Sequence, residues 1–210
     1  MPDSDVDVQE TVFIVDDDPA VREGLCNLVE SAGLRAQSYS CAENFLEAWE
    51  PGMRGCLVLD VKLPQMSGLD LQARLAESQR MIPVIVMTAY ADIATVRKAL
   101  KAGAAEFLVK PFQGGELLHA VEQAFTLDRE RRQRDDAVSS IRARLETLTE
   151  REREVLELVT AGFLNKQIAD KLCLSLVTVK MHRGQVMRKM GAKTVPDLVR
   201  MWQAFRGPGG

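Results

Sequence analysis

Long hydrophobic runs are absent from this sequence. No stretch approaches the roughly 18 consecutive apolar residues that a membrane-spanning helix needs. The first ten residues, MPDSDVDVQE, are acidic and lack the apolar core of a secretory leader. We therefore expect neither insertion into a membrane nor export through one.

Cysteine is sparse, and its spacing excludes the usual cysteine-based sites. The four thiols belong to Cys26, Cys41, Cys56 and Cys173. They form no close pair of the kind that binds zinc or builds a disulfide framework, and they lie in apolar-rich segments. We predict reduced thiols, in the core or near the surface, and a cytoplasmic protein.

Charge is plentiful but unevenly distributed along the 210 residues, whose net charge is −3. Residues 1–127 hold 10 Lys and Arg against 19 Asp and Glu, residues 128–147 hold 6 against 5, and residues 148–210 hold 11 against 6. The three segments therefore carry −9, +1 and +5. This asymmetry, in a chain long enough for two domains, predicts an acidic domain joined to a basic one that can approach a polyanion.

Short β-branched runs alternate with helical patterns from residue 11 to about 126. The expected strands are TVFIV (11–15), LRAQSY (34–39), GCLVLD (55–60), PVIVMT (83–88) and EFLVK (106–110). The last three are almost unbroken apolar runs, as central parallel strands should be. The repeats predict an α/β domain over residues 8–127: a doubly wound, five-stranded parallel sheet with its functional groups at the carboxyl ends of the strands.

Helix ends in this domain carry recognisable signals. Asp18, followed by a proline, is expected to cap the first helix. Ser40 with Glu43 is expected to form a capping box. Gly33 and Gly103 stand where helices should stop.

The strand signal disappears beyond residue 127. Residues 128–147 are predicted to form a helical linker, because Val138, Ile141 and Leu145 recur at helical spacing ahead of Leu148. Two interpretations stay open: a solvated connecting helix, or a coiled segment that forms a dimer. Residues 148–206 are predicted to form a small all-α domain of four short helices, the first opened by a Thr149–Glu152 capping box.

The stretch FIVDDDP (13–19) crowds three carboxylates, Asp16, Asp17 and Asp18, behind an apolar run. Like charges placed side by side raise one another's proton affinity. The triplet is therefore either a solvated turn with a helix cap, or part of a cation site that is completed by distant residues.

Parallel strands favour the cation site, because they all end at one edge of the sheet. The strand ends would bring together Asp16, Asp17, Asp60, Thr88 and Lys110. Mg²⁺ prefers a few carboxylates together with water and phosphate oxygens, so it would relieve the repulsion. An aspartate in such a place can accept a phosphoryl group through positioning and charge neutralisation.

Four motifs, FIVDDD, LVLDVKLPQMSG, VIVMTAY and EFLVKPF, resemble those of the receiver domain of two-component response regulators. The resemblance covers residues 11 to about 126 and implies a flavodoxin-like receiver fold. It implies Asp60 as the phosphoacceptor, with Asp17 and the main-chain carbonyl of Lys62 as Mg²⁺ ligands beside Asp60. Asp16 would hold the metal through water.

The same resemblance implies roles for three further residues. The Thr88 hydroxyl would bind a phosphoryl oxygen, and Lys110 would pair with the charge. Phe107 matches the aromatic switch of the family. Asp18 would then serve only as the helix cap.

An aspartate-nucleophile phosphatase is the rival interpretation of a strand-end aspartate that works with Mg²⁺. That class needs a second acidic residue two positions after the nucleophile. Here that position holds Lys62. With no other catalytic constellation in the sequence, we expect no enzymatic activity beyond self-phosphotransfer and dephosphorylation.

The basic C-terminal segment shows a helix-turn-helix pattern. Residues 165–172 predict one short helix and residues 176–190 a longer one, in which Val179, Val186 and Met190 alternate with basic residues. The charges alone would also suit a solvated helix face. LTEREREVLELV, NKQIA and TVKMHRGQVMRKMGAK resemble the LuxR-type DNA-binding domain of the FixJ/NarL regulators.

That resemblance implies a set of DNA contacts. Lys180, Met181 and Gly184 would face the major groove. The implied phosphate contacts are Lys166, Thr178, Arg183 and Lys189, and His182 would be partly packed. Phosphate contacts would set affinity and register, whereas base-edge contacts carry sequence information.

Gly184 departs from the family, since a side chain that can reach a base stands there in relatives. A glycine within a helix costs about 1 kcal/mol relative to alanine. Either the backbone approaches DNA or a neighbouring helix closely at this point, or the glycine contributes to specificity.

The combined resemblance implies a response regulator that a partner histidine kinase phosphorylates on Asp60 and that then binds promoter DNA. The phosphorylated form would dimerise and work with RNA polymerase, as an activator by family resemblance. The overall pattern is also similar to regulators of aromatic-hydrocarbon breakdown of the styrene-pathway type. A constitutive DNA-binding scaffold with an unphosphorylated receiver is the alternative.

Tyr90 generates a prediction about the lifetime of the phosphoryl group. In the family, the positions of Lys62 and Tyr90 flank the path of the hydrolytic water, and we hypothesise that the bulky Tyr90 restricts it. Tyr90→Ala should therefore shorten the half-life of the phosphorylated protein, measured as the decay of labelled protein after the donor is removed. Equal decay in the wild type and the variant would refute the hypothesis.

Overall fold

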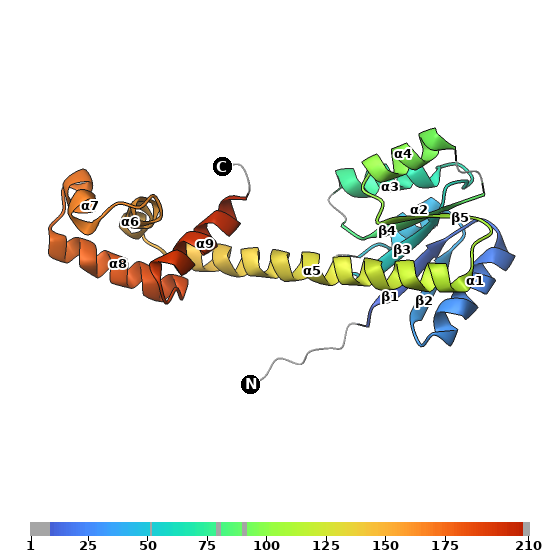
Figure 1. Ribbon diagram of the computed structural model, residues 1–210, viewed down its shortest axis with the longest axis horizontal. Helices are drawn as coiled ribbons and strands as arrows, with labels where there is room; N and C mark the ends of the chain where they lie inside the picture. Colours follow the sequence, from blue (N-terminus) through green and yellow to red (C-terminus); the bar gives the residue numbers. More distant parts are fainter. Residues whose placement is uncertain (1–8, 51, 79–80, 90–91, 208–210) are drawn as a thin grey trace. The chain divides into compact units, whose positions relative to one another are not determined.

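The computed structural model describes residues 9–50, 52–78, 81–89 and 92–207. Contacts divide the chain after Arg131 into two compact units, Met1–Arg131 and Arg132–Gly210. These are the N-terminal unit and the C-terminal unit (Figure 1). No helix among the described residues is both long enough and apolar enough to cross a membrane.

The N-terminal unit is a five-stranded parallel sheet with helices on both faces. Its strands lie in the order β2-β1-β3-β4-β5. Along the chain the elements are β1 (Thr11–Val15), α1 (Pro19–Ser31), β2 (Arg35–Tyr39), α2 (Ala42–Ala48), β3 (Gly55–Asp60), α3 (Gly68–Glu77), β4 (Val84–Thr88), α4 (Ile93–Lys101), β5 (Glu106–Val109) and α5 (Gly114–Glu146). The expected doubly wound α/β fold is confirmed.

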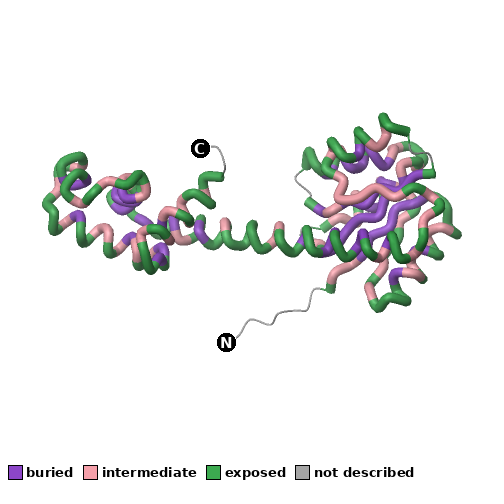
Figure 2. Tube along the Cα trace, in the orientation of Figure 1, coloured by how far each residue is buried: buried purple, intermediate pink, exposed green. Residues whose placement is uncertain are grey.

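The core lies on both faces of the sheet, because strand side chains alternate between them. Val12 and Ile14 of β1 pack with helix α1 and with the buried face of α5, whereas Phe13 and Val15 pack with α2 and α3. Every residue of β3 and β4 is buried, and Figure 2 shows these strands as the buried centre of the unit. The near-continuous apolar runs thus reflect burial on two faces.

Local capping signals were mostly predicted correctly. The Asp18 side chain accepts hydrogen bonds from the backbone of the first turn of α1, and Gly33 and Gly103 adopt positive φ after α1 and α4. The prediction of a Ser40–Glu43 capping box is wrong. Helix α2 begins one residue later than expected, so Cys41 takes the capping position and makes no side-chain hydrogen bond there.

A buried carboxylate joins α5 to the beginning of β3. Asp128 is 1% exposed and accepts hydrogen bonds from the backbone N–H of Gly55 (3.2 Å) and from Arg131. Gly55 has φ +130°, and a Cβ there would lie 1.9 Å from the carbonyl oxygen of Thr11. Only glycine therefore fits where β1, β3 and α5 converge.

The C-terminal unit is all-α, as expected. The last turns of α5 are followed by α6 (Glu150–Thr160), α7 (Asn165–Leu172), α8 (Leu176–Met190) and α9 (Val195–Arg206). The Thr149–Glu152 capping box is confirmed.

Residues of the linker complete the core of this unit. Ile141 and Leu145 of α5 pack with Leu148 and the buried residues of α6 to α9. Arg144 donates a hydrogen bond to the carbonyl oxygen of Met190 (2.8 Å), at the end of α8. The apolar stripe of the linker is therefore accounted for largely by packing within the unit.

Replacing the carboxylate that anchors α5 should destabilise the N-terminal unit. Asp128→Ala leaves the buried N–H of Gly55 without its acceptor and removes one ion-pair partner of Arg131, which should cost about 3 kcal/mol. The free energy of unfolding can be measured by urea titration, with Trp49 as the reporter in a Trp202→Phe background.

Glu122 supplies the matched control, because its carboxylate is exposed on the same helix. Glu122→Ala should change the stability by less than about 0.5 kcal/mol. Equal stabilities of the two variants would contradict an anchoring role for Asp128.

Candidate phosphoacceptor site and DNA-binding helix

The carboxyl edge of the parallel sheet brings most of the predicted receiver residues together. Asp16 follows β1, Asp60 ends β3, Thr88 ends β4 and Lys110 follows β5. Asp16, Asp60 and Thr88 are buried, with exposed fractions of 1%, 6% and 2%. Residues almost a hundred positions apart thus share one site because every strand of the sheet ends at the same edge.

Lys110 lies between the two buried carboxylates. Its Nζ donates to Asp16 Oδ2 (2.6 Å) and to Asp60 Oδ1 (2.8 Å). The other oxygen of Asp60 accepts from the backbone N–H of Lys62 (2.8 Å), and the other oxygen of Asp16 from that of Asp18 (3.0 Å). Both carboxylates are consequently held in fixed orientations.

Burial and charge act in opposite directions in this site. Burial raises the pKa of the Asp60 carboxyl above its usual value, and the nearby Asp16 adds to the effect, although hydrogen bonds from Lys110 and Lys62 oppose it. Burial would lower the pKa of Lys110, but its hydrogen bonds to Asp16 and Asp60 outweigh burial, so this pKa is raised. Two buried carboxylates therefore share one ammonium. The positive charge near Asp60 is too small to offset the effect of burial on its pKa.

Asp17 lies differently from the other two predicted metal-site carboxylates, since it is exposed. Arg22, which the sequence analysis missed, donates to the main-chain carbonyls of Asp16 (2.8 Å) and Asp17 (2.9 Å) and so fixes this turn. In the part of the chain that the structure describes, no three His, Cys, Asp or Glu side chains come close enough together to hold a metal ion. Of the three carboxylates predicted for the metal site, all of which lie in the described residues, Asp16 and Asp60 are brought together through Lys110.

The donor set nevertheless suits a hard cation. Among the described residues Asp16 and Asp60 share the ammonium of Lys110, the exposed Asp17 directly follows Asp16 in the sequence, and Lys62 is exposed directly after β3. Mg²⁺ favours one or two carboxylates together with water and phosphate oxygens. Asp16, Asp17, Asp60 and the Lys62 carbonyl are therefore chemically suitable ligands.

Thr88 and Phe107 lie on adjoining strands. The backbone N–H of Lys110 donates to the Thr88 carbonyl (2.8 Å), so the end of β4 is tied directly to the lysine. Phe107 of β5 pairs with Val86 of β4 and is half-buried against the core. Tyr90 lies outside the described residues.

A glycine brings the loop after Asp60 close to the strand. A Cβ on Gly68 would lie 2.1 Å from the carbonyl oxygen of Asp60, and the Gly68 N–H donates to the Val61 carbonyl (3.0 Å). No role was predicted for Gly68 from the sequence. Its position at the start of α3 lets the loop turn back tightly beside the acceptor strand.

Helices α7 and α8 form the expected helix-turn-helix. Cys173 ends α7 in the left-handed conformation (φ 54°), and the Ser175 side chain caps α8 by accepting from the backbone N–H of Thr178. Val179, Val186 and Met190, the apolar positions of the predicted helix, are buried in the core of the unit. One face of α8 is thus fixed, which leaves the opposite face available.

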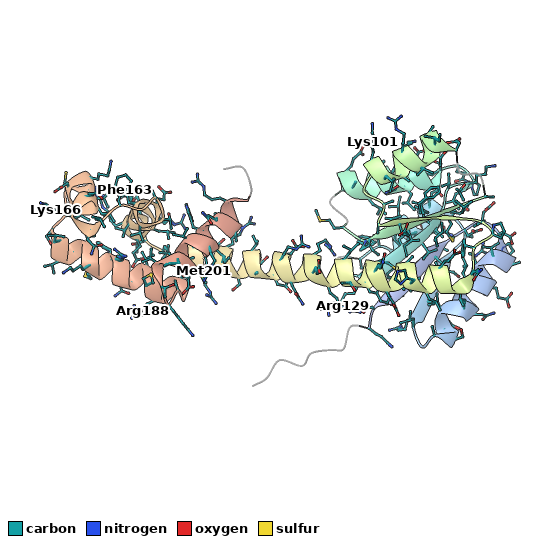
Figure 3. The ribbon with its side chains drawn as sticks, in the orientation of Figure 1. Lys101, Arg129, Phe163, Lys166, Arg188 and Met201 are labelled. Atoms are coloured by element: carbon teal, nitrogen blue, oxygen red, sulfur yellow. The ribbon has the colours of Figure 1, made fainter. Side chains whose placement is uncertain are left out.

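The residues expected to contact DNA fall into two groups. Lys166, Lys180, Met181 and Gly184 are exposed, and Thr178 is half-buried. His182, which was expected to be partly packed, is half-buried as well. Figure 3 shows Lys166 on α7 and Arg188 on α8 with their side chains on the outside of the unit.

Arg183 and Lys189 already have protein partners. Arg183 donates to Asn165 Oδ1 (2.6 Å). Lys189 donates to Glu152 Oε2 (2.6 Å) and to the carbonyl of Thr147 (3.0 Å), which ties the end of α8 to the start of α6. These contacts join residues far apart in the sequence, so local spacing around Arg183 and Lys189 did not predict them.

The space around Gly184 is open. Apart from its two chain neighbours and the nearby backbone of α8 itself, a Cβ there would meet no atom of the described chain within 4 Å. Close approach of a neighbouring helix, one of the explanations for this glycine, is therefore wrong within this unit. Approach of DNA and a specificity role are the explanations that are left.

Comparison with known protein families gives a match for each of the two parts of the chain. Residues 12–122 match the response regulator receiver domain, and residues 146–202 match the luxR family of bacterial regulatory proteins. The chain belongs to the response regulators with a luxR-type output domain. With this output domain it is a transcriptional regulator that carries a DNA-binding domain.

Similar response regulators match nearly the whole chain. Nodulation protein W of Bradyrhizobium diazoefficiens is 45% identical and the match covers 90% of this chain and 84% of that protein. Response regulator protein TmoT of Ectopseudomonas mendocina is 44% identical over 95% of this chain and 91% of its own. The low-resolution structure of response regulator StyR superposes with a TM-score of 0.82 at 45% identity, covering 92% of this chain and 98% of that one.

The ion pair between Glu152 and Lys189 generates a prediction about acid stability. Burial opposes ionisation, but the hydrogen bonds from Lys189 and from the backbone N–H of Thr149 lower the pKa of Glu152 below its usual value. Its contribution to stability is therefore complete above the unfolded-state pKa, about 4.3, and is lost as the pH falls through the lower folded-state value. Glu152→Gln should lose about 2 kcal/mol at pH 7 and show less acid dependence.

Urea unfolding at several pH values, followed by Trp202 fluorescence in a Trp49→Phe background, measures this effect. Glu157→Gln on the exposed face of α6 is the control and should keep the acid dependence of the parent. An unchanged acid dependence in Glu152→Gln would show that the pair does not stabilise the unit.

Proposed function

We propose that this response regulator is phosphorylated on Asp60 by a partner histidine kinase and binds promoter DNA in response. One observation carries the proposal: Lys110 hydrogen-bonds both Asp16 and Asp60 at the carboxyl edge of the sheet. An incoming phosphoryl group brings negative charge to this site. The ammonium of Lys110, already beside Asp60, is placed to offset part of that charge.

This geometry supports the following transfer step. A carboxylate oxygen of Asp60 attacks the phosphorus, the bond from phosphorus to the donor atom breaks, and the donor retains the electron pair. The Lys62 N–H and Lys110 hold the carboxylate in place for this attack. Bound Mg²⁺, held by Asp16, Asp17, Asp60 and the Lys62 carbonyl, would supply neutralising charge.

The signal would pass through Thr88 and Phe107. In our proposal Thr88 moves toward the phosphoryl group and its hydroxyl binds a phosphoryl oxygen. Phe107 then packs into the space that Thr88 leaves. The result is a population shift between two arrangements of the surface around α4 and β5. The phosphorylated form would dimerise, or would release the DNA-binding unit, and would act with RNA polymerase as an activator on a two-fold promoter site.

For the output unit, we propose groove contacts from Lys180, Met181 and Gly184 and phosphate contacts from Lys166 and Thr178. Arg183 and Lys189 are the other two proposed phosphate contacts. Each would either share its charge between DNA and its present partner, Asn165 or Glu152, or leave that partner. We propose a receiver at 8–127, a linker at 128–147 and a DNA-binding domain at 148–206. We also propose that the protein acts in the cytoplasm, as a regulator that does not turn over a substrate.

Incubation with acetyl phosphate and Mg²⁺ tests the acceptor directly. The wild type should gain one phosphoryl group, about 80 Da by mass spectrometry, whereas Asp60→Asn should gain none. Asp18→Asn is the matched control, because Asp18 belongs to the same acidic triplet but only caps α1. This control should be labelled as fully as the wild type, and EDTA should abolish labelling of both.

The same samples separate the proposal from a constitutive scaffold. DNA affinity should rise with phosphorylation in the wild type and in Asp18→Asn, and should stay at its basal value in Asp60→Asn. A labelled wild type whose DNA affinity does not change would support the scaffold instead.

A further inference from the structure

Helix α8 exposes apolar side chains on the face opposite its buried one. Val177 is 77% exposed and Met181 is 55% exposed. They stand four residues apart and are therefore neighbours on one side of the helix. Val179, Val186 and Met190 are fully buried in the core, so the packing of the unit does not explain the exposed pair.

The surroundings of this pair favour a polyanion as its occupant. Lys180 on the same helix and Lys166 on α7 are both exposed, and residues 148–210 hold 11 Lys and Arg against 6 Asp and Glu. An apolar protein partner would be disfavoured by the cost of removing these ammonium groups from water. DNA can accept both features, because phosphates flank a groove whose floor has apolar groups.

The chemistry of the two side chains restricts what they can detect. Valine and methionine carry no hydrogen-bond donor, so they cannot read the polar pattern of a base edge in the way that Arg or Asn does. The apolar group that bases present in the major groove is the C5-methyl of thymine. Gly184, one further turn along α8, has open space around it and would let the helix lie close to the bases.

We propose that Val177, with Met181 beside it, reads thymine methyl groups in the DNA site of this protein. The inference rests on the proposed DNA binding and adds a specificity-determining residue to it. Val177 is the second residue of α8, and the N-terminal residues of a recognition helix are those that contact base edges. Val177 carried no signal in the sequence, and its 77% exposed fraction in the structure is the observation that points to it.

Replacing thymine with uracil tests the inference, because it removes the methyl group and leaves the hydrogen-bonding edge of the base intact. Duplexes are first selected from a random-sequence pool by the full-length protein treated with acetyl phosphate. Each thymine of the best duplex is then replaced singly by deoxyuridine, and Kd is measured by fluorescence anisotropy. One buried methyl contact should be worth roughly fourfold in Kd.

Comparison of variants assigns the effect to Val177. For one or more of the single replacements, the wild type should bind the uracil duplex roughly fourfold more weakly than the thymine duplex. For at least one of these sensitive replacements, Val177→Ala should bind the two duplexes equally. Lys166→Ala is the control: it should weaken binding to both duplexes alike and reduce the salt dependence, since it would remove a phosphate contact. Folding is not at risk in Val177→Ala, because this side chain is largely exposed.

Two outcomes would overturn the inference. Uracil duplexes that bind as tightly as thymine duplexes at every position would exclude methyl reading. A Val177→Ala variant that still discriminates at every sensitive position would exclude Val177 as the reader. Failure of the wild type to bind any duplex at low salt would instead remove the proposed DNA-binding function, and the inference with it.

Discussion

The ammonium of Lys110, shared between Asp16 and Asp60, is the interaction on which the receiver site depends. Two carboxylates this deeply buried repel each other, and their hydrogen bonds to one lysine offset that repulsion. The arrangement requires β1, β3 and β5 to end together, so the parallel sheet is a condition of the chemistry. It also leaves the site short of positive charge, which is why a divalent cation suits it.

A second buried ion pair organises the output unit in a similar way. Lys189 joins Glu152 and the Thr147 carbonyl, and Arg144 caps the last turn of α8 through Met190. These contacts hold the end of α8 that lies away from its capping residue, Ser175. One end of the helix is thus fixed by protein contacts, and the exposed apolar residues stand at the other.

Much of this molecule could be predicted from sequence where the signal is local or repeated. The strands, the bounds of α7 and α8, the Asp18 cap and the meeting of Asp16, Asp60 and Lys110 follow from apolar periodicity and from the common edge of a parallel sheet. The Ser40 box failed because a shift of one residue in the helix start moves the capping position. Contacts such as Asp128 with Gly55, 73 positions apart, depend on tertiary packing and leave no mark in local spacing.

The packing of Ile141 and Leu145 has a practical consequence for dissecting the protein. A fragment that begins at residue 148 would omit these two core side chains, together with Arg144 and its bond to Met190. Such a fragment would expose part of its hydrophobic centre to solvent and would tend to aggregate. An isolated output unit should therefore start several turns earlier, within α5, if its behaviour is to represent that of the intact chain.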